Sequence, residues 1–521
     1  MATFEWIIAL LLGAALLAAL AHRMGAPYPT FLALGGTALA FVPNSPDWTL
    51  DPHLALTLFV APVLVDAAYD TSLRDLRRNW RPVAGLVIAA VGTTVLAVAL
   101  VARWLVPDMP WAIAIALGAI VAPPDAAAAT AVMRQVGLPH KLLKILEGES
   151  LLNDASALLI YRLAIMVVLA GHLSPGAFVP VLLLTVVGSL VAGIALARLL
   201  QPLQRRVQDV AIALIVQFSL TFAVWIAAEA VGLSGILTLV AYAMTVARNG
   251  SRDMPARMRV PIFAAWEIVV FVLNAFAFVL IGMQLRPIWQ RLEASGGQWS
   301  AVVTALAVLA ATVLARFAWV LCYHAGKRWR LSRQPAGDAP SPKPTLGSGI
   351  VLSWAGMRGI VTLAAAFAIP QTLPDGSPFP HRDLILLCAF AVVLGTLVLQ
   401  GLTMGPLIRA LGLRDDDPVG REIRLARTHA YGALIEAIRD EDGLAAKLLR
   451  KEYGAVVDLN ASHDANAPLE EVPGGPLRRR AIAAARQRAF ELRRDEVIGD
   501  DAYRVLVREL DWAELSAGGA R

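Results

Sequence analysis

Long apolar runs alternate with short polar segments along most of this chain, and the runs have the length of membrane-spanning helices. A helix needs about 20 predominantly apolar residues to cross a bilayer. Thirteen stretches meet or approach this length, so the pattern predicts an all-α polytopic membrane protein. The predicted spans are 4–22, 28–43, 54–70, 83–106, 111–133, 142–170, 176–200, 209–229, 232–248, 262–285, 299–325, 346–370 and 383–410.

The pattern changes near residue 412, where apolar runs give way to segments rich in Arg, Asp and Glu. We therefore predict a transmembrane domain over residues 1–411 and a helical tail over residues 412–521. Helical periodicity in the tail indicates amphipathic helices. Solvated helices without a specific ligand are the simplest interpretation; regulation, dimer contact and membrane-surface binding are the alternatives.

Composition and charge agree with this division. Of the 521 residues, 57% are hydrophobic and 17% are charged, whereas soluble domains carry about 25% charged residues. A net charge of +6 could suit a nucleic-acid partner, but much of the excess Arg lies in short loops between apolar runs. We therefore expect a lipid bilayer and no nucleic acid as the partner. Cys322 and Cys388 lie in apolar runs and indicate neither a disulfide framework nor a metal site.

Basic residues follow the odd-numbered spans and set the expected orientation. The segment "DTSLRDLRRNWRP" follows the third span, and Arg205 and Arg206 follow the seventh, whereas "PDMP" and "GHLSPG" carry no basic residue. Because cytoplasmic loops hold the excess of Lys and Arg, the N-terminus is expected outside and the tail in the cytoplasm. Three basic residues in the alternate loops are exceptions: Arg286, Arg291 and Arg382.

The sixth span carries a carboxylate in otherwise apolar surroundings, in the stretch "EGESLLNDASALLIY". Asp154 lies about twelve residues into this span, or roughly 18 Å along a helix, near the bilayer midplane. Ser150 precedes Asp154 by four residues and so shares its helix face. An ionisable residue at this depth is a functional candidate by default, although an ion pair between two helices is the alternative.

Two other spans are interrupted. Span five contains Pro123 and Pro124 followed by Asp125, and two prolines in mid-span should break the helix. In span twelve, Gly356 and Gly359 flank Arg358, and glycines permit an unwound segment. The two spans are seven apart, which predicts inverted six-helix units, spans one to six and eight to thirteen, with matching breaks. Paired breaks of this kind indicate the binding site of a transporter.

Further polar residues lie within predicted spans. Asp66 lies in span three, and Glu267 lies in span ten with Asn274. For Glu267, a place in the site and a structural pair with Arg358 are both open. Arg162 and Arg316 are interpreted as groups that pair helices or reach the membrane surface.

Four motifs together resemble one family. The segments "APPDAAAATAVMRQVGLP", "LEGESLLNDASALLIYR", "NAFAFVLIGMQL" and "WAGMRGIVTLAAAFAIP" have the order and spacing seen in NhaP/NHE-type sodium–proton antiporters. The resemblance covers residues 1 to about 410, and the tail resembles that of bacterial members. It implies thirteen spans, two crossed unwound helices, a homodimer, and exchange of a monovalent cation for a proton.

The resemblance also implies roles for individual residues. Asp154 resembles the carboxylate that binds the ion and the proton, and Ser150 a hydroxyl of that site. Asn153 resembles the Asn that fixes the broken helix and marks electroneutral members. Asp125 matches the Asp of a Thr-Asp-Pro segment in which Pro124 replaces the Thr.

Two further matches concern charge. Asp66 stands where the family often has Glu. When Asp154 is ionised, Na⁺ is expected to bind to Asp154 together with Asp66, Ser150 and backbone oxygens. Arg358 resembles a structural arginine, with one of two acids as its ion-pair partner: Glu149 or Glu267.

The expected mechanism is competition of Na⁺ (or Li⁺) and H⁺ for Asp154, with alternating access, in the inner cell membrane, serving pH homeostasis. No Walker-type glycine loop is present, and no cofactor is expected. K⁺/H⁺ antiport is the main alternative. A cation channel is another, as is an intramembrane aspartyl protease using Asp125 and Asp154, although the Gly-x-Gly-Asp segment of such proteases is absent.

Overall fold

The computed structural model describes residues 2–42, 54, 56–71, 76, 79–125, 140–170, 175–294, 298–332, 345–413, 418–462, 475–495, 497 and 500–517. Within these ranges the secondary structure is helical, and the only β pairing is an isolated bridge between Thr372 and Pro378. The chain divides into two units, Met1–Arg414 and Asp415–Arg521. The predicted boundary lay between residues 411 and 412.

The apolar runs form helices because a helix satisfies its own backbone hydrogen bonds where water is absent. The first unit comprises α1 (Ala2–Met24), α2 (Tyr28–Ala40), η1 (Leu56–Val60), α4 (Ala61–Asp70), α6 (Trp80–Ala84), η2 (Gly85–Ala90), α7 (Val91–Leu105), α8 (Trp111–Val121), α10 (His140–Ala170), α11 (Pro175–Arg206), α12 (Val210–Ala230), α13 (Gly235–Asp253), α14 (Ala256–Met283), α15 (Leu285–Ala294), α16 (Gln298–Ser332), α17 (Leu346–Trp354), α18 (Ile360–Phe367) and α19 (Arg382–Leu411), where η marks a π-helical turn.

Each of the thirteen predicted ranges overlaps at least one of these helices. Eight helices of the described residues are long and apolar enough to cross a membrane, and shorter apolar helices lie at Thr57–Tyr69, Trp111–Val121 and Gly235–Arg248.

Helix α15 was not predicted, because its ten residues are amphipathic rather than apolar. It carries two of the exceptional basic residues, and each has a partner. Arg291 donates to Asp383 at 2.8 Å, and Arg286 donates to the carbonyl of Ala40 at 3.4 Å. The third exception, Arg382, donates to the carbonyl of Ile369 at 3.2 Å.

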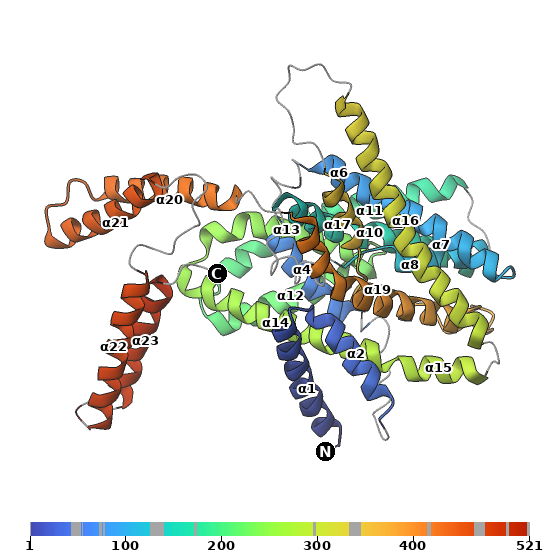
Figure 1. Cartoon of the computed structure of the whole chain (residues 1–521), viewed down its shortest axis with the longest axis horizontal. Coiled ribbons are helices and arrows are strands. Elements are labelled where there is room, and N and C mark those ends of the chain that lie inside the picture. Colours follow the sequence, from blue (N-terminus) through green and yellow to red (C-terminus); the bar gives the residue numbers. More distant parts are fainter. Residues whose placement is uncertain are drawn as a thin grey trace. The chain divides into compact units, whose positions relative to one another are not determined.

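The helices of the first unit pack around one continuous apolar core. Helix α14 packs against α1 and α2, and α16 crosses α7 and α19, while α10 contacts α8 (Figure 1). Helices α2 and α14 approach closely because Gly36 lacks a side chain: a Cβ there would clash with the carbonyl of Val279. These contacts position the two broken segments in the interior.

The second unit consists of two helical pairs. Helix α20 (Pro418–Ala437) packs on α21 (Leu444–Ser462), and α22 (Gly475–Arg494) packs on α23 (Asp500–Ala517). The rings of Tyr431 and Tyr453 stack between the first pair, with centroids 5.4 Å apart. In the second pair, Arg486 forms ion pairs with Asp511 and Glu514.

Candidate ion-binding site

The end of α8 meets the break between α17 and α18 inside the first unit, at the proline and glycine positions that the sequence singled out; the second half of span five, from residue 126, lies outside the described residues. Helix α8 ends at Val121, and the backbone is irregular from Ala122 to Asp125. Between α17 and α18 the backbone is irregular over residues 355–359. The two breaks touch, because the N–H of Asp125 donates to the carbonyl of Met357 at 2.6 Å. Backbone groups freed by each break therefore find partners in the other.

Arg358 donates several hydrogen bonds at this crossing, and it is only 1% exposed. Its guanidinium donates to the carbonyls of Val121 at 3.0 Å and Ala122 at 3.2 Å, and also to that of Gly356. Its own N–H donates to the Thr396 hydroxyl at 3.0 Å. The terminal carbonyls of a helix carry partial negative charge, so a cation there is stabilising.

The predicted ion pair of Arg358 with Glu149 or Glu267 is not among the ion pairs of the described residues, and it stays a prediction. Within the described residues, the guanidinium of Arg358 bonds to backbone carbonyls, and neither Glu149 nor Glu267 is hydrogen-bonded to it. The physical reason is that a broken helix exposes carbonyl acceptors, which satisfy a buried guanidinium as a carboxylate would.

Asp125 lies at the start of α18, whereas Arg358 contacts the end of α8. A Cβ on Gly359, the residue that caps α18, would clash with the carboxylate of Asp125. The carboxylate thus lies against the N-terminus of α18, where the helix dipole favours negative charge. The charges of Asp125 and Arg358 are thus opposite to the partial charges at the helix ends that they contact.

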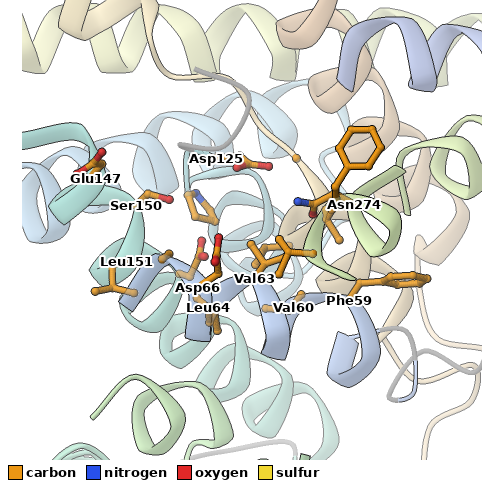
Figure 2. A pocket seen from close by; sticks show the side chains of 18 of the residues that line it. Phe59, Val60, Val63, Leu64, Asp66, Asp125, Glu147, Ser150, Leu151 and Asn274 are labelled. Carbon is orange, nitrogen blue, oxygen red and sulfur yellow. The ribbon is translucent and has the colours of Figure 1, made fainter. Parts of the chain in front are cut away.

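The crossing forms part of the wall of a cavity of about 770 Å³. Asp66 of α4, Ser150 of α10 and Asp125 face this space from three different elements (Figure 2). Asp154 of α10 also lines it and is 7% exposed. Within the described part of the chain, no cationic side chain forms an ion pair with Asp154. The alternative interpretation, in which Asp154 forms a structural ion pair, therefore has no supporting contact among the described residues.

Helix α10 carries cavity-lining residues on one face and the hydrogen-bonded residues Glu149 and Asn153 on the neighbouring face. Ser150 and Asp154, four residues apart, line the cavity, whereas Glu149 and Asn153 do not. These latter two lie one position earlier, about 100° around the helix. The Asn153 amide donates to Glu149 at 3.1 Å.

Glu149 is indeed in a buried ion pair, but its partner is Arg316 of α16. Arg316 donates to both carboxylate oxygens, with one contact at 2.9 Å, and its Nη2 also reaches the carbonyl of Leu352 at 3.1 Å. Glu149 is 0% and Arg316 2% exposed. The network joins α10 and α16 to the end of the first half-helix, α17, which fixes that face of α10.

The structure also places two other predicted site residues, Pro124 and Glu267. Pro124 is buried but is not among the residues that line the cavity, whereas Pro123 is. Glu267 of α14 lines the cavity, and its side chain is exposed. Its position suits contact with ions in the cavity rather than a structural pair.

Sequence reasoning missed Thr362 of α18. Its hydroxyl is buried in the cavity wall and has no hydrogen-bond partner among the described residues; the same is true of Oδ1 of Asn274. The available signal was the position of Thr362 three residues after the glycine of the break, on the same face of the half-helix.

The cavity is not a preformed metal centre. In the part of the chain that the structure describes, no three His, Cys, Asp or Glu side chains converge as metal ligands. Its polar groups include carboxylates, the hydroxyls of Ser150 and Thr362, and Oδ1 of Asn274, which are oxygen ligands suited to hard cations. Such a set can hold a cation transiently.

Comparison with known proteins decides the family. Residues 8–410 match the family described as "Sodium/hydrogen exchanger, transmembrane". The chain belongs to the sodium/hydrogen exchanger family.

Curated relatives match between about three quarters and nearly all of this exchanger. It is 31% identical to an uncharacterized Na⁺/H⁺ exchanger of Mycobacterium tuberculosis (strain ATCC 25618 / H37Rv), over 98% of this chain and 95% of the relative. It is 32% identical to the "Sodium, potassium, lithium and rubidium/H(+) antiporter" of Bacillus subtilis (strain 168), over 72% of this chain and 56% of the relative.

The fold is also that of a solved member. The sodium proton antiporter MjNhaP1 from Methanocaldococcus jannaschii superposes with a TM-score of 0.61 at 17% identity, over 79% of this chain and 99% of MjNhaP1. The resemblance to NhaP-type antiporters is thereby confirmed. The exchanger is a membrane transporter that exchanges cations for protons, and the protease interpretation does not fit this family.

Proposed function

We propose that this exchanger moves one Na⁺ (or Li⁺) against one H⁺ and is electroneutral. The observation that carries the proposal is the cavity at the crossed breaks, which brings Asp66, Asp125, Ser150 and Asp154 to one space from three segments of the chain.

Asp154 is proposed to bind the cation and the proton alternately. An isolated buried charge is costly, so a carboxylate in this wall gains from taking up either one. With a proton bound it is neutral and cannot hold Na⁺; when ionised it binds Na⁺ with Ser150, Asp66, water and backbone oxygens.

Electroneutrality follows from the same exchange. A site that carries either one proton or one monovalent cation on Asp154 has the same net charge in both loaded states. The proposal assigns the exchanged charge to Asp154 alone; Asp125 and Arg358 instead lie at oppositely polarised helix ends, which their charges compensate. Asn153 adds no charge next to Asp154, and its amide is engaged by Glu149.

The wider architecture is proposed from the same family pattern. We place the protein in the inner cell membrane as a homodimer with thirteen spans, two inverted six-helix units, an outer N-terminus and a cytoplasmic tail. Basic loops after odd-numbered spans support this orientation. Its role would be sodium and pH homeostasis, with no cofactor beyond the transported ions.

K⁺/H⁺ antiport is the second candidate, because the relative of Bacillus subtilis is named for potassium and rubidium as well as sodium and lithium. An oxygen-lined cavity of this size imposes no evident selection among these ions.

The test is proton efflux from proteoliposomes against gradients of Na⁺, Li⁺ and K⁺. Efflux should follow the Na⁺ and Li⁺ gradients, be independent of an imposed membrane potential, and vanish in Asp154→Asn. Dominant K⁺ exchange would select the second candidate. Normal exchange by Asp154→Asn would overturn the assignment of the site, and cation flux without counter-transport would indicate a channel.

A further inference from the structure

Thr362 of α18 carries a hydroxyl that differs from those of threonines inside continuous helices. There, a threonine hydroxyl commonly donates to the carbonyl four residues earlier. Examples are the contacts of Thr304, Thr312 and Thr396, each at 2.7 Å. The residue four positions before Thr362 is Arg358, which lies in the irregular segment 355–359. The break therefore removes the usual acceptor, and the Thr362 hydroxyl has no hydrogen-bond partner among the described residues.

Asn274 of α14 presents a second oxygen of this kind. Its Oδ1 has no hydrogen-bond partner in the described part of the chain, and the residue is 4% exposed, against 1% for Thr362. Both residues line the cavity at the crossed breaks, and α14 packs on α18. Figure 2 shows Asn274 on the side of this cavity that is opposite to Glu147 and Ser150 of α10. The cavity thus has unpartnered oxygens across from the α10 face of the proposed site.

Two unpartnered oxygens in one cavity wall need an explanation, because a buried polar group without a hydrogen bond is destabilising. In native proteins nearly all such groups are satisfied by protein, by water or by a bound ligand. Thr362 and Asn274 both line the space that the proposed site residues Asp66 and Asp154 also line. We therefore look for their partner in what enters the cavity, rather than in another side chain.

The chemistry of the two oxygens favours a cation as that partner. Oδ1 of an asparagine accepts but cannot donate, so it binds a cation or a hydrogen-bond donor and repels an anion. A threonine hydroxyl also has two acceptor lone pairs. Because threonine takes two χ1 rotamers in helices, the Thr362 hydroxyl can turn toward an ion in the cavity. Such neutral oxygens are ligands for hard cations, and the acids of the same cavity supply the negative charge.

We propose that Thr362 and Asn274 are further ligands of the transported cation. Asp154, Ser150 and Asp66 hold the ion from α10 and α4, and the two neutral side chains hold it from α18 and α14. The inference rests on the proposed function, because it places the ion at Asp154. It adds that the affinity for the cation depends on two uncharged residues, and that the break in span twelve supplies one of them.

The test compares near-isosteric variants of the full-length exchanger in proteoliposomes, with whichever of Na⁺, Li⁺ and K⁺ drives exchange. Thr362→Val removes the hydroxyl and keeps the shape of the side chain. It should raise the cation concentration for half-maximal exchange roughly tenfold, as expected for the loss of one contact to a charged group. Thr362→Ser keeps the hydroxyl and should stay within about twofold of the unchanged protein.

Thermal unfolding of the purified variants separates lost binding from lost folding. Without the transported cation, Thr362→Val should unfold at the same or a higher temperature than the unchanged protein, because the substitution removes an unpartnered hydroxyl and no hydrogen bond. Addition of the cation should then raise its unfolding temperature less than that of the unchanged protein. A lower unfolding temperature without the cation would contradict the unpartnered state of the hydroxyl and overturn the inference.

The matched control is Thr238→Val. Thr238 of α13 is also buried with an unpartnered hydroxyl, but it is not among the described residues that line the cavity, so its replacement should not change the half-maximal concentration. Thr362→Val combined with Asn274→Leu should cost less than the product of the two single effects, because both side chains bind one ion.

An unchanged half-maximal concentration in Thr362→Val, or an equal increase in Thr238→Val, would overturn the inference and leave water as the partner of these oxygens. Asp154→Asn, measured in parallel, separates this result from the proposed function. Normal exchange by Asp154→Asn would overturn the proposed site itself. Loss of exchange in Asp154→Asn together with an unaffected Thr362→Val would overturn only the role of the neutral ligands.

Discussion

Replacing Glu149 by Gln should destabilise the exchanger strongly, although the shape of the side chain is nearly unchanged. The substitution leaves the guanidinium of Arg316, which is 2% exposed, without its counter-charge. Removing one partner of a buried ion pair costs about 3–5 kcal/mol. Arg316 keeps its bond to the Leu352 carbonyl and gains a neutral amide oxygen, so we expect a loss of about 3 kcal/mol, at the lower end of that range.

The matched control is Glu229→Gln. Glu229 also pairs with an arginine between two helices, Arg162, at 2.5 Å, but the two side chains are 31% and 39% exposed. An exposed pair contributes about 0–1 kcal/mol. The free energy of unfolding, measured by reversible denaturation of the purified protein in mixed micelles, should therefore separate the two variants by about 2 kcal/mol or more.

A double replacement distinguishes lost charge from lost packing. Glu149→Leu with Arg316→Met removes both charges, and apolar replacement of a buried pair is often neutral or stabilising. This variant should be more stable than Glu149→Gln alone. If Glu149→Gln costs no more than Glu229→Gln, the argument from an uncompensated buried charge is wrong.

Three further predictions concern the site. Gly359→Ala should displace the Asp125 carboxylate, lower the free energy of unfolding by about 1–3 kcal/mol and abolish exchange. Gly13→Ala is the control, because the space beside its Cα is open, and it should change neither quantity. Equal effects of the two variants in thermal unfolding and vesicle assays would refute this. Glu267→Gln should raise the Na⁺ concentration for half-maximal exchange severalfold and leave the maximal rate unchanged, because the residue lines the cavity with an exposed side chain. A lower maximal rate alone would contradict this prediction. Asn153→Asp should place a second carboxylate against the buried acid that it contacts at 3.1 Å, and should lower the unfolding temperature more than Asn153→Ala does; the reverse order would disprove it.

Much of the site was accessible from local sequence. The four-residue spacing of Ser150 and Asp154 places both on one helix face, and both line the cavity. The paired prolines and the glycines around Arg358 predicted two breaks; α8 ends just before the prolines, and α17 is separated from α18 at the glycines. These inferences succeed because helix periodicity and proline sterics depend only on neighbouring residues.

Pairing of charges was less predictable. Arg358 was expected on a glutamate because opposite charges attract, but a broken helix offers carbonyls that are invisible in a residue pattern. Two of its three carbonyl acceptors, those of Ala122 and Val121, lie 236 and 237 positions away. Likewise, Glu149 had two candidate arginines in the apolar runs besides Arg358, and nothing local distinguishes Arg316 from Arg162.

The sequence by itself determined that this protein is a helical membrane transporter, where its helices are interrupted and which face of α10 carries Asp154. Run length, proline and helical period are local quantities, and lipid imposes the same rules on every span. Only the tertiary structure decided that Arg316 meets Glu149 across 167 positions, that Arg358 caps α8, and that Glu267 borders the cavity. Those outcomes depend on which helices cross and at what height, and that is set by packing of the whole unit rather than by any segment alone.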